Sequence, residues 1–257
     1  MTAIREAHER RMKYFQVLAH RGLVSEFVPE NTTKAFADAL LAGADVIETD
    51  VRATADGIAV IFHDEDLLRL AGIPKKVAEI TWKEISAIDI GFGKRVPTLQ
   101  QVLQDFPKAR FNLDIKSDLA IEPVANVINA LGVQNRVLIS SFSDSRRIKT
   151  LKKISGSVGT SAGSTRVLAL WLCSILGATP LFQFFSRQIT ALQIPISRFP
   201  IRLDSKRFVR FALNAGLELH YWTINDPIEI QRLLNLGATG VVTDNCDLVI
   251  SKFRNEK

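Results

Sequence analysis

The chain has 257 residues, 47% of them hydrophobic, which fits one large domain with a substantial core. Its net charge of +6 favours anionic partners such as phosphate esters or an acidic membrane surface. It contains no nucleic-acid-binding motif, so no nucleic acid is predicted as a partner, and Cys173 and Cys246 form no CxxC that would indicate a zinc site. Residues 1–13 are charged and lack the apolar run of a signal peptide, which predicts a cytoplasmic protein.

The first predicted elements are a strand and a helix. An apolar, β-type run predicts a strand over 16–20, which ends at His20. The amphipathic stretch at 31–41 predicts a helix that is capped near Asn31 and stops at Gly43.

A hairpin follows this helix. The second strand is predicted at 45–51, and a tight turn at 54–57 leads into another apolar run at 58–62. That turn is too short for a crossover helix, so the run at 58–62 is predicted to be an antiparallel hairpin strand. The less regular stretch at 81–97 is predicted to be a lid-like loop with a short helix at 82–88.

The rest of the chain alternates short strands with helical stretches. Further strands are predicted at 111–115, 137–141, 158–161, 191–194, 219–224 and 240–243. Helices between them include 121–131, 144–153, 205–215 and 227–236. Eight such units predict a (β/α)8 TIM barrel in one domain over 1–257, with the hairpin strand inserted after the second strand. An open doubly wound sheet is the alternative, but no glycine-rich dinucleotide turn follows the first strand.

One segment, 167–185, contains no charged residue and has the length of a short membrane span. Gly177 and Pro180 interrupt it near the middle, so two short apolar helices are predicted instead. They either pack on the barrel or a second subunit, or form an apolar lip that makes a peripheral membrane contact.

Polar residues gather at the predicted carboxyl ends of the strands, where barrel enzymes build their active sites. These residues are His20, Arg21, Glu48, Asp50, Asp114, Lys116, Ser141, Trp222, Asn225 and Asp244, and pairing across the hairpin turn is predicted to place His63 near Glu48. Strand period two points Glu48 and Asp50 the same way, so that with Asp114 they can surround one hard cation such as Mg²⁺, Ca²⁺ or Mn²⁺. Arg21 and Lys116 would flank the anion bound to that metal.

Structural readings compete with these functional ones. Glu48 and Asp50 can instead form salt bridges with Arg21 or Lys116. Other residues of the set have simpler readings: Asn31, Asp64 and Asp244 as helix caps, Trp222 as a core aromatic, and His8 and His220 as ordinary polar residues. Glu30 either orients Arg21 or touches the metal.

Taken together, the motifs resemble those of the glycerophosphodiester phosphodiesterase family. The matching segments, in order, are His20-Arg21-Gly22, Pro29-Glu30-Asn31-Thr32, Glu48-x-Asp50-Val51, Thr54-x-Asp56-Gly57, His63-Asp64, Pro97-Thr98-Leu99, Asp114-x-Lys116, Ser140-Ser141-Phe142, Trp222-Thr223-Ile224-Asn225 and Gly240-Val-Val-Thr-Asp244. Each motif is weak alone, but their order and spacing from 17 to 247 are specific.

The resemblance implies metal-dependent hydrolysis of glycerophosphodiesters to glycerol 3-phosphate and an alcohol. It assigns the roles of an acid/base pair to His20 and His63, of metal ligands to Glu48, Asp50 and Asp114, and of substrate-binding residues to Arg21, Lys116 and Trp222. Glu30 and Asp64 would support these residues from behind. The family commonly has Glu at the position of Asp114, whose shorter side chain implies a ligand that reaches the metal through water.

Two other functions remain open at this point. Related barrels act on membrane lipids as lysophospholipase D-type or sphingomyelinase D-type enzymes, which the apolar segment 167–185 would suit. The third possibility is an inactive barrel that binds a phosphorylated ligand, although both histidines and the paired carboxylates are present.

Overall fold

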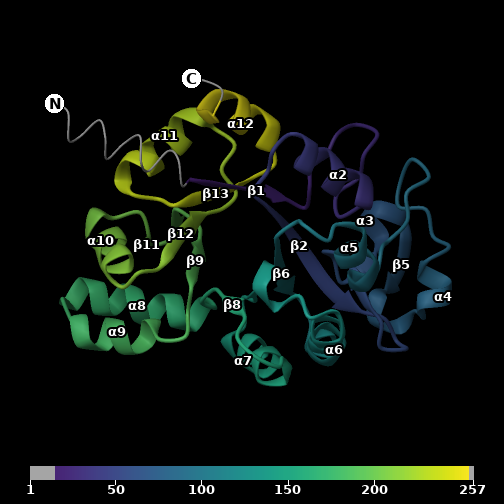
Figure 1. The fold of residues 1–257 in the computed structure, drawn as a ribbon, viewed down its shortest axis with the longest axis horizontal. Coiled ribbons are helices and arrows are strands. Elements are labelled where there is room, and N and C mark those ends of the chain that lie inside the picture. The colour runs from purple at the N-terminus through teal and green to yellow at the C-terminus, as the bar shows by residue number, and fades with distance from the viewer. Residues whose placement is uncertain (1–14, 255–257) are drawn as a thin grey trace.

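Eight parallel strands form the centre of the structure, a computed structural model that describes residues 15–254 (Figure 1). The strands are β1 (Gln16–His20), β2 (Val46–Ala53), β6 (Phe111–Ile115), β7 (Val137–Ser140), β8 (Gly159–Thr160), β9 (Ala191–Ile194), β12 (Glu218–Tyr221) and β13 (Gly240–Thr243). Their order is β8-β7-β6-β2-β1-β13-β12-β9, and a parallel bridge between Ser161 and Ala191 joins the two ends. The predicted (β/α)8 barrel is therefore confirmed.

Helices surround this barrel (Figure 1). They are α2 (Thr33–Leu41), α5 (Leu99–Asp105), α6 (Ile121–Leu131), α7 (Asp144–Lys153), α8 (Ser164–Leu176), α9 (Thr179–Ser186), α10 (Lys206–Asn214), α11 (Pro227–Leu236) and α12 (Cys246–Arg254), with 3-10 turns η2 (Asp118–Ala120) and η3 (Gln134–Arg136). No bounds were predicted for α5 or α12, although the cap interpretation of Asp244 implied a last helix. The predictions on residues 1–13 and His8 lie outside the described residues, so the cytoplasmic location stays a prediction.

The start of α2 corrects one prediction. Its N-cap is Thr32, whose hydroxyl oxygen accepts a hydrogen bond from the Ala35 N–H. Asn31 does not cap the helix, because it has a left-handed backbone (φ +57°) and its side chain bonds to Thr49 and Asp50 instead.

Strand registry sets which side chains share the barrel interior. His20 lies opposite Glu48 on β2, and Asp50 lies opposite Asp114 on β6. Leu18, Val46 and Val242 form an apolar layer beneath His20 and Glu48. Leu18 and Val46 lie two residues earlier on the same strands, and Trp222 packs against this layer. The polar side chains therefore lie above an apolar layer, at the carboxyl end of the barrel.

An insertion separates β2 from α5. It begins with β3 (Ala59–Ile61), which pairs antiparallel with β2, as predicted for the hairpin strand. It continues through β4 (Asp66–Leu67), α3 (Leu68–Ala71), β5 (Ile73–Lys76), the 3-10 turn η1 (Val77–Glu79) and α4 (Trp82–Ile85). The insertion buries an apolar cluster of its own around Val60, Phe62 and Ile85. Of the elements after β3, the sequence predicted only the helix at 82–88, which is α4 and ends at Ile85.

Two predicted strands end two or three residues away from their ends in the structure. The second strand continues to Ala53, because β3 extends its pairing beyond the barrel. The strand predicted at 219–224 ends at Tyr221, so Trp222 follows the strand as the first residue of the loop.

The uncharged segment forms two helices, as predicted. α8 ends at Gly177, which has a left-handed backbone (φ +71°), and α9 follows. Among residues 15–254, no helix is both long and apolar enough to cross a lipid bilayer.

Candidate active site

A tight turn after β1 brings the first two site residues to the barrel mouth. Arg21 and Gly22 both have positive φ, and the Arg21 N–H donates to the Glu48 carbonyl at 2.9 Å. A Cβ at Gly22 would lie 2.7 Å from the Ala35 side chain, so only glycine fits against α2 here. The turn thus fixes His20 and Arg21 beside β2.

His20 is held by a carboxylate from the last strand end. Its Nδ1 lies 2.7 Å from Asp244 Oδ1, and the Asn225 amide donates to the other Asp244 oxygen at 2.7 Å. An ionised carboxylate only accepts, so Nδ1 carries the hydrogen and Nε2 is left for proton transfer. Burial lowers the pKa of His20, but the bond to Asp244 and the charge of Glu48 outweigh it and raise that pKa above its usual value.

Asp244 and Asn225 therefore belong to the site. The helix-cap reading of Asp244 is wrong, because its two oxygens bond to His20 and Asn225.

His63 has a similar partner on the inserted segment. Its Nδ1 lies 2.6 Å from Asp64 Oδ1, and the Arg69 Nε donates to Asp64 Oδ2 at 2.6 Å. Burial alone would raise the pKa of Asp64, but the bonds to Arg69 and His63 lower it. The cap reading of Asp64 is wrong, since α3 has no side-chain cap.

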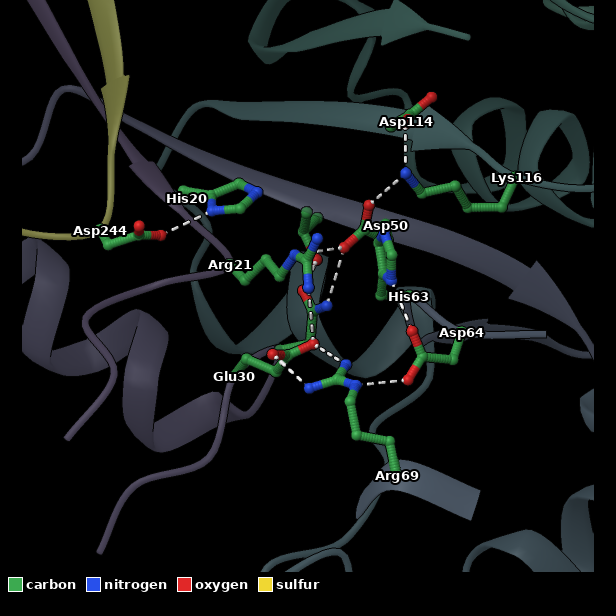
Figure 2. A network of polar contacts seen from close by, with 12 residues as sticks. His20, Arg21, Glu30, Asp50, His63, Asp64, Arg69, Asp114, Lys116 and Asp244 are labelled. Atoms are coloured by element: carbon green, nitrogen blue, oxygen red, sulfur yellow. Dashed lines mark hydrogen bonds and ion pairs between the residues drawn. The ribbon is translucent and has the colours of Figure 1, made fainter. Parts of the chain in front are cut away.

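Arg69 links this pair to the barrel (Figure 2). It donates two hydrogen bonds to Glu30, at 3.0 and 2.6 Å, and Arg21 donates to the same carboxylate at 2.9 Å. Burial alone would raise the pKa of Glu30, but Arg69 and Arg21 outweigh this effect and hold that pKa below its usual value. Glu30 thus orients Arg21, the first of the two roles considered for it.

Asp50 is the central carboxylate of this network (Figure 2). One oxygen lies 2.8 Å from Lys116 Nζ, and the other lies 3.2 Å from Arg21 Nε and accepts from the Asn31 amide at 2.9 Å. Burial would raise the pKa of Asp50, but these two cations and the hydrogen bonds lower it, so the group stays ionised. Asp50 thus forms the ion pairs with Arg21 and Lys116 that the structural interpretation predicted.

Glu48 and Asp114 are different, because each has a buried oxygen without a partner. Glu48 Oε2 and Asp114 Oδ1 accept no hydrogen bond from residues 15–254, although the second Asp114 oxygen accepts from Lys116 at 2.6 Å. Burial and the charge of Asp50 raise the pKa of Glu48 to about 8, and burial raises the pKa of Asp114. An unpartnered carboxylate oxygen is costly to bury unless a cation compensates it.

These two oxygens fit a divalent cation. Carboxylate oxygens are the ligands of hard ions such as Mg²⁺ and Ca²⁺. Within residues 15–254, however, no three His, Cys, Asp or Glu side chains lie in an arrangement that would hold a metal directly.

The Lys116 ammonium bridges Asp50 and Asp114, and those acids raise the pKa of Lys116 to about 12 against the effect of burial.

Aromatic rings form one wall of the mouth. Trp222 meets Phe142 edge to face, with ring centroids 5.7 Å apart, and the Lys116 ammonium lies 5.6 Å from the Phe142 ring centre. The rings offer an apolar surface beside cations, which suits a ligand with a carbon backbone and a charged phosphate.

The structure thus brings all the predicted site residues to one end of the barrel, and it adds two that the sequence did not assign to the site, Asn31 and Arg69. Asn225 and Asp244 were already in the predicted cluster, because each follows a predicted strand, but the contacts of neither were predicted. Asn31 and Arg69 lie in loops whose paths the pattern does not fix.

Comparison with known proteins agrees with this geometry. Residues 20–248 match the model of the glycerophosphoryl diester phosphodiesterase family. A Mycobacterium tuberculosis protein named probable glycerophosphodiester phosphodiesterase 2 is 38% identical over 90% of this chain and 88% of its own. The human protein named lysophospholipase D GDPD1 is 26% identical over 92% of this chain and 86% of its own.

A solved structure extends the agreement to the fold. The crystal structure of glycerophosphodiester phosphodiesterase from Agrobacterium tumefaciens has a TM-score of 0.74 and 26% identity, covering 94% of this chain and 99% of that one. The chain therefore belongs to the glycerophosphoryl diester phosphodiesterase family of enzymes.

Proposed function

We propose that this enzyme hydrolyses glycerophosphodiesters to glycerol 3-phosphate and an alcohol, using a divalent cation and the imidazoles of His20 and His63. Membership of the family supports the reaction class. The observation that carries the mechanism is a matched pair of histidines, each fixed at Nδ1 by a carboxylate, beside buried carboxylate oxygens that lack a partner.

The metal would be held by Glu48, Asp50 and Asp114. Glu48 and Asp114 each bring an unpartnered oxygen, whereas both Asp50 oxygens are engaged by Lys116, Arg21 and Asn31. The cation, Mg²⁺, Ca²⁺ or Mn²⁺, would neutralise charge on the phosphate oxygens when bound.

The cationic side chains would bind the phosphate and the aromatic ring the glycerol. Arg21 is kept in place by Glu30, so its guanidinium is oriented before substrate arrives. Lys116 remains protonated at neutral pH, because its neighbours raise its pKa. Trp222 would line the glycerol pocket.

Proton transfer falls to the Nε2 atoms of the histidines. One imidazole accepts a proton from the nucleophile, and the other donates one to the leaving alkoxide. The nucleophile is either water or the glycerol 2-hydroxyl, and the second choice passes through a cyclic phosphate.

A lysophospholipase D-type activity is the second candidate. It is favoured by the exposed apolar side chains of α8 and α9 and by the similarity to a protein named lysophospholipase D. A peripheral membrane contact through residues 167–185 would bring such a lipid to the enzyme.

A product assay separates these candidates. The enzyme is incubated with a panel of glycerophosphodiesters and lysophospholipids in Mg²⁺, Ca²⁺, Mn²⁺ or chelator, and phosphorus NMR follows the products and any cyclic phosphate. We expect glycerol 3-phosphate from the water-soluble diesters, with loss of turnover in chelator. Full turnover in chelator, or products from none of the substrates, would refute the proposal.

A further inference from the structure

Helices α8 and α9 expose apolar side chains that no part of residues 15–254 covers. The exposed fractions run from 43% for Leu168 to 78% for Leu176. We call the following set the apolar face: Leu168, Leu172, Ile175, Leu176, Leu181 and Phe184. The two helices lie side by side at the edge of the barrel, below α10 in Figure 1.

The side of α8 that packs on the protein is not the side that carries the apolar face. The helix buries Leu170, Cys173 and Ser174, whereas Leu168, Leu172 and Ile175 recur at helical spacing on its opposite, exposed side. α9 buries Phe182 against Phe208 and Phe211 of α10 and turns Leu181 and Phe184 outward. A surface helix normally places charged or polar residues on its outer side, so core packing does not explain this pattern.

Another exposed aromatic side chain lies on the hairpin that follows β9. The hairpin of β10 (Ser197–Arg198) and β11 (Ile201–Arg202) carries Phe199, whose side chain is 99% exposed. The Trp171 indole of α8 donates to the Arg202 carbonyl at 3.2 Å, which ties this hairpin to α8. The hairpin follows the carboxyl end of β9, the end of the barrel where the polar site lies.

The segment that carries the apolar face has charged residues of one sign. Residues 164–203, which include α8, α9 and the β10–β11 hairpin, contain four Arg and no Lys, Asp or Glu. Within residues 15–254, Arg166, Arg187 and Arg198 form no ion pair with a carboxylate, and Arg187 lies 5.9 Å from the Phe184 ring centre. Apolar side chains flanked by unpaired arginines match an interface where acyl chains lie beneath anionic phosphates.

We propose that the apolar face and Phe199 dock this enzyme on an anionic lipid bilayer. α8 has 13 residues and would lie in the plane of the interface, with the arginines at the level of the lipid phosphates. The docked orientation would bring the β9 side of the barrel mouth toward the membrane.

Vesicle sedimentation of the full chain tests the proposal. Vesicles of phosphatidylcholine with and without phosphatidylglycerol are compared, using the wild type, the double variant Leu172→Ser/Leu176→Ser and the matched control Leu41→Ser/Leu248→Ser. The control residues are also exposed leucines, at 86% and 61%, but lie on α2 and α12. Hydrolysis of soluble glycerophosphocholine is measured in parallel and should be unchanged in both variants.

We expect the wild type and the control to bind anionic vesicles, and the α8 variant to bind about tenfold or more weakly. Arg187→Gln/Arg198→Gln should weaken binding to anionic vesicles alone. Absence of wild-type binding, or equal loss in the control, would overturn the proposal. So would a wild-type dimer that the α8 variant converts to monomer, since a second copy would then cover the apolar face. Because binding is measured without substrate, this result stands apart from the proposed activity.

Discussion

The two histidine pairs make the same contact but are supported by different parts of the molecule. His20 is the last residue of β1, Asp244 directly follows β13, and the neutral amide of Asn225 supports the carboxylate. His63 and Asp64 lie on the inserted segment, and the cationic Arg69 supports that carboxylate. The charge of Arg21 acts on Asp244 without a hydrogen bond, whereas Arg69 donates a hydrogen bond directly to Asp64.

This difference has a consequence for proton transfer. Asp244 and Glu48 both favour the protonated form of His20 and raise its pKa. The His63 pair instead belongs to a network of alternating charges that runs through Arg69, Glu30 and Arg21 to Asp50 (Figure 2). The barrel pair is thus polarised toward a protonated His20, whereas the inserted pair belongs to a chain of ion pairs.

Removal of either imidazole should have the largest effect. We expect His20→Ala and His63→Ala each to lower kcat by about 10²- to 10⁴-fold, because each variant lacks one proton-transfer group. Steady-state kinetics on glycerophosphocholine measures this, with the thermal midpoint as the control for folding. Near wild-type kcat in either variant would remove that histidine from the mechanism.

The raised pKa of Glu48 should make the metal-free protein less stable at high pH. The folded-state pKa of Glu48 is about 8, above its unfolded value, so the folded state binds the extra proton between about pH 4.5 and 8. The raised pKa values of Asp114 and His20 act in the same direction. Stability should therefore fall as pH rises through this window, by roughly a few kcal/mol.

Urea unfolding in chelator at pH 5 and pH 8 measures this slope. Glu48→Gln should flatten it, because the titrating group is gone. A wild type that is equally stable or more stable at pH 8 would contradict the electrostatic account of Glu48.

Exchange of each supporting carboxylate tests the comparison of the two pairs directly. We expect Asp244→Asn and Asp64→Asn each to lower kcat by about 10- to 100-fold, since an amide no longer fixes the Nδ1 hydrogen. Asp244→Asn should also lower the pKa of His20, which NMR titration of the imidazole resonances can follow. The matched control is Asp38→Asn, whose carboxylate pairs with Lys34 on the surface of α2. An unchanged pKa of His20 in Asp244→Asn would mean that the barrel pair is not polarised as described.

Arg69→Gln should have the smallest effect, about tenfold or less on kcat, because Arg69 acts through Asp64 and Glu30. A double-mutant cycle with Asp64→Asn measures the coupling, and the effect of Arg69→Gln should shrink in that background. A loss as large as that of His63→Ala, independent of Asp64, would assign Arg69 a direct role.

The barrel part of the site was predictable, and in the inserted part His63 and Asp64 were predicted but the contacts of Arg69 were not. Parallel strands end at one face, so His20, Glu48, Asp50 and Asp114 could be placed together from strand period alone. The β4–β5 hairpin was missed because its two bridges involve short, mostly exposed stretches without alternation.

Loop residues were harder to place because backbone conformation decides their contacts. Asn31 directly precedes the N-cap residue Thr32. Because its backbone is left-handed, its side-chain amide donates to Asp50 and does not cap the helix. The contact between Arg69 and Glu30 joins residues 39 apart, across two loops, which no local pattern encodes.

Direct titration of metal into the chelator-treated protein tests the central claim, that the unpartnered oxygens of Glu48 and Asp114 form a cation site between the two histidine pairs. Calorimetry with Mn²⁺ should show one site in the wild type, and Glu48→Gln should abolish or strongly weaken it. Equal Mn²⁺ binding by Glu48→Gln and the wild type would contradict the account.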